Sequence, residues 1–260
     1  VEKFNRFYEF EMNEPKDASA IILIKDDRVL LAQRNPNLKF LGGWHAFSGG
    51  KLDKPDCNIE VRNCEDIELQ QFIVCAVREL FEEVGVLIVR NGDKLTKGQR
   101  ASLHDDLVSG RSTFKEILDD WNLRIDAEDF IYTGFWTTPQ FSPVRFKTRF
   151  FLAKRKKKQT PYEAISEMQN LEFVTPEEAL NRWAKGEILI SPPVLISLQE
   201  LGKFYRDGQD TQDNSSYPFH LLHPCKKLLE KSKTCDGNID YVELNSRVIV
   251  FPLKTPTLPP

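Results

Sequence analysis

The chain lacks several features that would point to particular classes of protein. No apolar run approaches the roughly 20 residues that a helix needs to cross a bilayer, and no basic leader followed by an apolar stretch marks secretion. The five cysteines are odd in number and contain no C-x-x-C pair, which argues against both a zinc site and a disulfide framework. We therefore expect a protein of a reducing compartment, the cytoplasm.

An excess of charge of one sign is also lacking, because 36 Lys and Arg stand against 39 Asp and Glu. This balance gives no reason to expect a polyanion as a partner. The only basic block, "KRKKK" at 154–158, follows the strand-like "RFFLA" and is interpreted as a solvated strand end rather than a nucleic-acid patch. We expect a small-molecule substrate, and neither nucleic acid nor a membrane as a partner.

The composition is that of an ordinary globular protein, with 40% hydrophobic and 29% charged residues. A length of 260 residues suits one large domain or one domain with a sizeable appendage. After Tyr205 the chain turns polar in "RDGQDTQDNSSYP", which is typical of a linker. We therefore predict one domain over residues 1–205, followed by a linker and C-terminal extension at 206–260.

Hydrophobic spacing predicts the order of helices and strands. Residues 18–34 predict a hairpin, and an apolar stripe at three- and four-residue spacing predicts a helix at 67–84 that ends at Gly85. The same criteria predict a loop at 54–66, strands at 84–92, 129–139 and 144–155, helices at 96–121, 175–186 and 191–205, and two short strands within 241–253. This irregular order indicates an α+β protein or an α/β/α sandwich.

The stretch "AVRELFEEVG" at 76–85 concentrates acidic residues on one helix face. Glu79, Glu82 and Glu83 lie at positions i, i+3 and i+4, near a helix C-terminus where the macrodipole disfavours negative charge. No lysine lies within a turn, and the only nearby cation is Arg78. A solvated acidic face is one interpretation. The alternative is a site for a hard divalent cation, since Mg²⁺ and Mn²⁺ prefer carboxylate oxygens.

The order "RELFEEVGV" at 78–86 resembles the second half of the Nudix box, G-x5-E-x7-R-E-U-x-E-E-x-G-U, where U is aliphatic. Gly49 and Gly50 of "FSGGKLD" resemble its start. Arg78 lies 28 positions after Gly50, where the family has 14, so the box at 49–86 carries an insertion, which we place at 54–66. Counted back from Arg78, the family's first glutamate falls on Gln70.

This resemblance covers residues 15 to 205 and implies an α/β/α sandwich with a mixed sheet, carrying a helical insertion at 95–122. It also implies a diphosphatase that uses Mg²⁺ or Mn²⁺, bound by Glu79, Glu82 and Glu83 and by the Gly50 carbonyl. Arg78 would anchor these carboxylates through charge-assisted hydrogen bonds. Many relatives place a base in a remote loop, and Glu167 is the candidate here; an exposed loop glutamate without a role is an equal alternative.

The stretch "LLAQRNPNLKFLGGWHAFSGG" at 30–50 is similar to the motif of coenzyme A diphosphatases, L-L-T-x-R-S-x3-R-x3-G-x3-F-P-G-G. Lys39 replaces the second arginine and Ser48 the proline. The interrupted box also resembles the peroxisomal branch of that family, although "LPP" is no peroxisomal signal. We expect a coenzyme A diphosphatase in which the apolar face of 95–122 covers the pantetheine arm. The expected substrate contacts are Arg34, Lys39, Trp44, His45 and Phe47. A nucleotide-sugar or dinucleotide pyrophosphatase and a non-catalytic nucleotide-binding module remain alternatives.

The C-terminal stretch "VIVFPLKTPTLPP" at 248–260 resembles the start of a metallo-β-lactamase-like domain in some bacterial Nudix fusion proteins. On this resemblance we expect residues 206–260 to be a linker and the first strands of a second domain.

Overall fold

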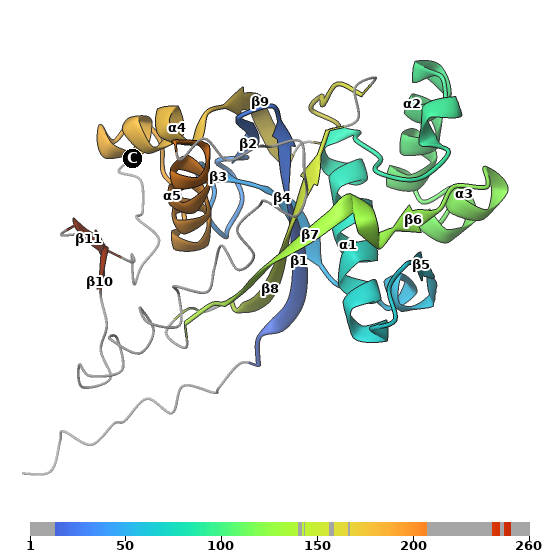
Figure 1. Ribbon diagram of the computed structural model, residues 1–260, viewed down its shortest axis with the longest axis horizontal. Coiled ribbons are helices and arrows are strands. Elements are labelled where there is room, and N and C mark those ends of the chain that lie inside the picture. Colours follow the sequence, from blue (N-terminus) through green and yellow to red (C-terminus); the bar gives the residue numbers. More distant parts are fainter. Residues whose placement is uncertain are drawn as a thin grey trace, which may run out of the picture.

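The computed structural model describes residues 14–139, 142, 144–155, 159–165 and 167–206, together with the backbone of 241–244 and 247–250. A mixed seven-stranded sheet lies between α1 on one face and α4 and α5 on the other (Figure 1). Its strands are β1 (Lys16–Lys25), β2 (Arg28–Arg34), β3 (His45–Ala46), β4 (Ser48–Lys51), β7 (Phe130–Thr137), β8 (Phe146–Lys154) and β9 (Met168–Val174). The helices are α1 (Ile67–Val84), α2 (Lys97–Val108), α3 (Phe114–Asp120), α4 (Pro176–Ala184) and α5 (Pro192–Arg206). The predicted α/β/α sandwich with a mixed sheet is confirmed.

The central strand β1 explains why the sheet has two covered faces. Ile21 and Leu23 point into the core beneath α1, whereas Ile22 and Ile24 point into the core beneath α4 and α5. A strand buried on both faces is an almost continuous apolar run, as "AIILI" is. β1 pairs with β8 in parallel and with β2 and β4 in antiparallel register, which places Gly49 and Gly50 beside the start of β1.

Helix α1 begins and ends where local sequence chemistry predicts. The Asp66 side chain accepts a hydrogen bond from the backbone N–H of Leu69 and caps the N-terminus. Gly85 adopts a left-handed conformation with φ of 67° and donates its N–H to the oxygen of Phe81. No helix among the described residues is long and apolar enough to cross a membrane.

The predicted strand at 84–92 is wrong. Residues 85–89 join no sheet, and Arg90 makes only an isolated bridge to Arg124. A side chain replaces the missing strand partner, because the amide of Gln159 accepts from the N–H of Leu87 at 2.7 Å and donates to its oxygen at 2.7 Å. Apolar residues in this segment are therefore buried without belonging to a strand.

The box insertion pairs with the chain just after the helical insertion. The segment predicted as a loop, 54–66, contains a 3-10 helix η1 (Lys54–Asn58) and a strand β5 (Val61–Arg62), which pairs with β6 (Ile125–Asp126) beyond the helical insertion. The helix predicted over 96–121 is present as two helices, α2 and α3, interrupted around Gly110 with its φ of 71°. Shorter 3-10 helices are η2 (Gly92–Lys94) and η3 (Ala127–Asp129).

The C-terminal extension is described only in part. The two short strands predicted within 241–253 are present as β10 (Tyr241–Leu244) and β11 (Arg247–Val250), and the structure pairs them antiparallel. The predicted linker and most of the expected second-domain start, residues 207–240 and 251–260, lie outside the described residues.

Candidate active site

Strand β4 packs on the acidic face of α1. A Cβ atom at Gly50 would lie 2.4 Å from the Glu79 carboxyl carbon, so any other residue here would displace this carboxylate. Glu83 is 3% exposed, and its Oε2 accepts the Ser48 hydroxyl at 2.6 Å and the Gly49 N–H at 2.9 Å. The solvated-face interpretation is therefore wrong, because at least Glu83 is enclosed by β4.

Arg78 connects the carboxylates on the other side of the cluster. Its Nε and Nη2 donate to the two oxygens of Asp56 at 2.8 and 2.9 Å. Its Nη1 donates to Glu79 at 2.9 Å and to Glu82 at 3.1 Å, and Nη2 also donates to the backbone oxygen of Lys51 at 3.0 Å. One guanidinium thus fixes three carboxylates, two of them in α1 and the third in η1.

Asp56 is the main site residue that the sequence analysis missed. Its side chain is 1% exposed and is the bidentate partner of Arg78. Counted back from Arg78, the position of the family's first glutamate falls on Gln70, but counted forward from Gly50 through G-x5 it falls on Asp56. The residues that lengthen the box therefore lie between Asp56 and Arg78. Gln70 instead supports the insertion, accepting from the Val61 N–H and donating to the Cys64 oxygen.

Burial dominates the electrostatics of the three glutamates. It raises the pKa of Glu79 to about 7, against the opposing charge of Arg78. It raises the pKa of Glu83 to about 8, against the hydrogen bonds from Ser48 and Gly49. Burial likewise raises the pKa of Glu82. The cluster is therefore short of positive charge, which a divalent cation would supply.

The donor set fits a hard divalent cation in its chemistry, since it consists of carboxylate and backbone oxygens beside a glycine. In the conformation seen, however, no three His, Cys, Asp or Glu side chains in the described part of the chain converge closely enough to hold a metal. Arg78 engages Glu79 and Glu82, while Ser48 and Gly49 engage Glu83. In these contacts each of the three glutamates is held through one oxygen, so metal binding requires these side chains to move closer together while Arg78 remains paired with Asp56.

Among the predicted substrate contacts, Arg34 is one whose charge acts on the carboxylate cluster. Its charge lowers the pKa of Glu83 in opposition to burial, and its Nε donates to the oxygen of Phe40 at 3.3 Å. Lys39 is exposed and Trp44 is half-buried, both in the loop between β2 and β3. Arg34 therefore provides positive charge near Glu83, and Lys39 and Trp44 follow it in the exposed or half-buried part of this loop.

His45 and Phe47 do not fit the predicted role of substrate contacts. Alternate residues of a strand point to opposite faces, so His45 and Phe47 point to the α4 and α5 face whereas Ser48 points to α1. His45 is 6% exposed, with its pKa lowered by burial and by the charge of Arg182. Phe47 is 4% exposed and belongs to the core beneath α5. Neither ring is available for stacking on a substrate.

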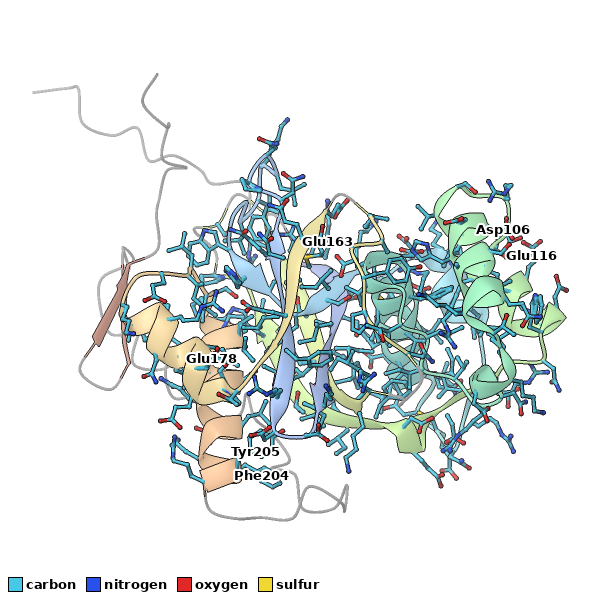
Figure 2. All side chains as sticks on the ribbon, turned by 90° about the horizontal axis from the view of Figure 1, so that it is seen from above. Asp106, Glu116, Glu163, Glu178, Phe204 and Tyr205 are labelled. Carbon is cyan, nitrogen blue, oxygen red and sulfur yellow. The ribbon has the colours of Figure 1, made fainter. Side chains whose placement is uncertain are left out.

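Two glutamates lie in the segment that leads into β9 and contacts the C-terminal end of α1. The predicted base Glu167 is exposed, and its backbone oxygen accepts from the N–H of Asn35 at 2.8 Å. Glu163, labelled in Figure 2, accepts the N–H of Asn170 at 2.6 Å. Next to it, the N–H of Ala164 donates to the backbone oxygen of Glu83 at 3.3 Å. Sequence reasoning did not select Glu163, which is a second candidate for the base.

The helical insertion supports the C-terminal end of α1. The Nε2 of His104 lies 2.9 Å from the backbone oxygen of Glu82, one of the last-turn carbonyls that lack a partner within the helix. The imidazole also packs edge-on against the rings of Phe81 and Tyr162. Much of the apolar face that was expected to cover the pantetheine arm is buried in the core, namely Leu103, Phe114, Ile117 and Leu118, whereas Trp121 is 40% exposed.

Comparison with known proteins decides the family. A sequence profile of the NUDT19 Nudix domain matches residues 65–201, and one of the NUDIX domain matches residues 14–113. The chain belongs to the Nudix hydrolase family. This Nudix hydrolase is 30% identical over 241 residues to nudix hydrolase 7 of Caenorhabditis elegans, covering 91% of this chain and 77% of that protein.

Other relatives agree with this assignment. The human acyl-coenzyme A diphosphatase NUDT19 is 26% identical over 229 residues, covering 68% of this chain and 61% of that protein. The crystal structure of a NUDIX hydrolase from Alicyclobacillus acidocaldarius superposes with a TM-score of 0.66 at 27% identity, covering 74% of this chain and 93% of that chain. The protein is a hydrolase acting on pyrophosphate bonds, and Nudix hydrolases generally use divalent metals.

Proposed function

We propose that this Nudix hydrolase cleaves coenzyme A or acyl-coenzyme A into 3′,5′-ADP and phosphopantetheine or its acyl ester. The match of residues 65–201 to the NUDT19 Nudix domain carries the choice of substrate. The human relative with that domain is named as an acyl-coenzyme A diphosphatase, although this chain spans only 61% of its length. The motif similarity at residues 30–50 supports the same substrate class.

The carboxylate cluster supplies the chemistry. A bound Mg²⁺ or Mn²⁺ would neutralise charge on the diphosphate and activate the attacking water. Glu79, Glu82 and Glu83, with the Gly50 carbonyl, would hold the cation. Arg78 would stay fixed by Asp56 while the neighbouring carboxylates change partners, because Asp56 occupies both its Nε and its Nη2.

Arg34 and the loop after it suit the two ends of the substrate. Arg34 lies within electrostatic range of Glu83 and would donate to a diphosphate oxygen. Lys39 would meet the 3′-phosphate as a point charge, and Trp44 offers a ring for stacking on adenine. Water attacks one phosphorus, the bond from that phosphorus to the bridging oxygen breaks, and each half keeps one phosphate. Glu167 or Glu163 would take the proton of the water.

A substrate screen tests the proposal. We expect the two products named above, identified by mass spectrometry, in the presence of Mg²⁺ or Mn²⁺. Glu82→Gln should fold and yet lower kcat by orders of magnitude, since it removes charge while keeping shape. If the wild type hydrolyses ADP-ribose, a nucleotide sugar or a dinucleotide tenfold better than any coenzyme A ester, the substrate assignment is wrong. If it binds nucleotides but hydrolyses none, the non-catalytic alternative holds.

The base is assigned by a matched pair of variants. Glu163→Gln and Glu167→Gln make the same change in the same segment, four positions apart. Loss of the base should lower kcat with little change in KM. The variant whose rate stays within twofold of the wild type identifies the glutamate that has no catalytic role.

A further inference from the structure

We propose that Ser48 is a positioning residue for metal binding, which holds one oxygen of Glu83 so that the other faces the cation. This inference rests on the proposed role of Glu83 as a metal ligand. It does not depend on which nucleoside diphosphate is the substrate.

The geometry at Glu83 is asymmetric. Its Oε2 accepts two hydrogen bonds, from the Ser48 hydroxyl at 2.6 Å and from the Gly49 N–H at 2.9 Å. Its Oε1 accepts none from the residues that the structure describes. A carboxylate held by two donors at one oxygen cannot rotate freely, so its second oxygen is presented in a fixed direction.

Ser48 is itself held in place. It is 4% exposed and lies in β4 opposite Ile21 of the central strand. Its hydroxyl therefore approaches Glu83 from a rigid element and not from a loop, which favours precise positioning. A buried carboxylate that loses a donor also carries a desolvation cost, because water does not reach it.

The serine is a departure from the motif that the rest of this segment resembles. The coenzyme A diphosphatase motif has proline at this position, and proline has neither a hydroxyl nor an N–H group to donate. With proline, only the Gly49 N–H would remain to hold Glu83. This chain therefore has a second donor to Glu83 that the motif does not provide.

The test measures Mn²⁺ binding in the absence of substrate, by titration calorimetry. Ser48→Ala should weaken binding about tenfold, as loss of an outer partner of a metal ligand typically does. Ser48→Thr, which keeps the hydroxyl, should stay within twofold of the wild type. The matched control is Ser197→Ala, another buried serine, whose hydroxyl bonds to Pro193 in α5 on the opposite face of the sheet. It should bind Mn²⁺ as the wild type does.

The result that would overturn the inference is an unchanged Kd for Mn²⁺ in Ser48→Ala, with a loss of thermal stability like that of Ser197→Ala. Ser48 would then only satisfy a buried carboxylate. If Ser48→Ala does not fold, Ser48→Cys decides, because a thiol is a weaker donor and should weaken Mn²⁺ binding in a folded protein. Glu83→Gln separates the two proposals: if it binds Mn²⁺ like the wild type, the metal assignment fails, whereas a wild type active on another substrate leaves the role of Ser48 intact.

Discussion

Replacing Asp56 with Asn tests whether this residue anchors the active-site arginine. Asp56 is buried and makes two hydrogen bonds to Arg78, at 2.8 and 2.9 Å. Breaking a buried ion pair by removing one charge costs about 3–5 kcal/mol. Arg78 would retain its hydrogen bonds to Glu79, Glu82 and the backbone oxygen of Lys51. We therefore expect Asp56→Asn to lower the free energy of unfolding by about 3 kcal/mol, the lower end of this range.

Asp53→Asn is the matched control, since Asp53 also lies near Arg78. Its carboxylate is 3.8 Å from the Nη2 of Arg78, and its side chain is 55% exposed. An exposed pair of this kind contributes about 0–1 kcal/mol. The measurement is the free energy of unfolding in urea, with the melting temperature as a second readout. For a domain of about 150–250 residues, 3 kcal/mol corresponds to a shift of about 6–12 °C.

The reasoning is refuted if Asp56→Asn and Asp53→Asn lose the same stability, or if Asp56→Asn loses less than about 1 kcal/mol. Either result would mean that Arg78 is held mainly by α1 and that the forward count from Gly50 to Asp56 has no structural meaning.

Three further predictions concern other parts of the site. Burial raises the pKa of Glu83 to about 8, so the stability that this group contributes is fully present below the unfolded pKa near 4.5 and is lost as the pH rises through 8. Metal-free protein should therefore unfold at a lower urea concentration at pH 9 than at pH 6. Glu83→Gln or added Mg²⁺ should reduce this difference. Lys39→Ala should raise KM for coenzyme A but not for 3′-dephospho-coenzyme A, and the control Lys25→Ala should change KM for neither substrate. Equal effects of Lys39→Ala on both substrates would contradict a contact with the 3′-phosphate. His104→Ala should lower the free energy of unfolding by about 2 kcal/mol, because it leaves a backbone oxygen in α1 without its donor. Asp106→Asn is the control. Asp106 lies on the outer side of α2 (Figure 2), and its replacement should lower the free energy of unfolding much less.

Local chemistry in the sequence determined the central elements of this fold. The apolar stripe and Gly85 predicted α1, and the structure adds Asp66 as its N-cap, because caps and helical periodicity act within a few residues of one another. The same periodicity placed Glu79, Glu82 and Glu83 on one face, and their order identified the family. Strand β1 was equally predictable, since a continuous apolar run with a polar turn after it indicates a buried strand in a hairpin.

Contacts between distant segments were decided only by the tertiary structure. Asp56 meets Arg78 because the box insertion folds back through β5, which pairs with β6 at residues 125–126. The pairing of β4 with β1 sets which residues of 45–48 point toward α1, so Ser48 reaches Glu83 while Phe47 enters the opposite core. A one-residue change of register would exchange these two faces. Hydrophobicity alone cannot choose between them, because both faces of this sheet are covered.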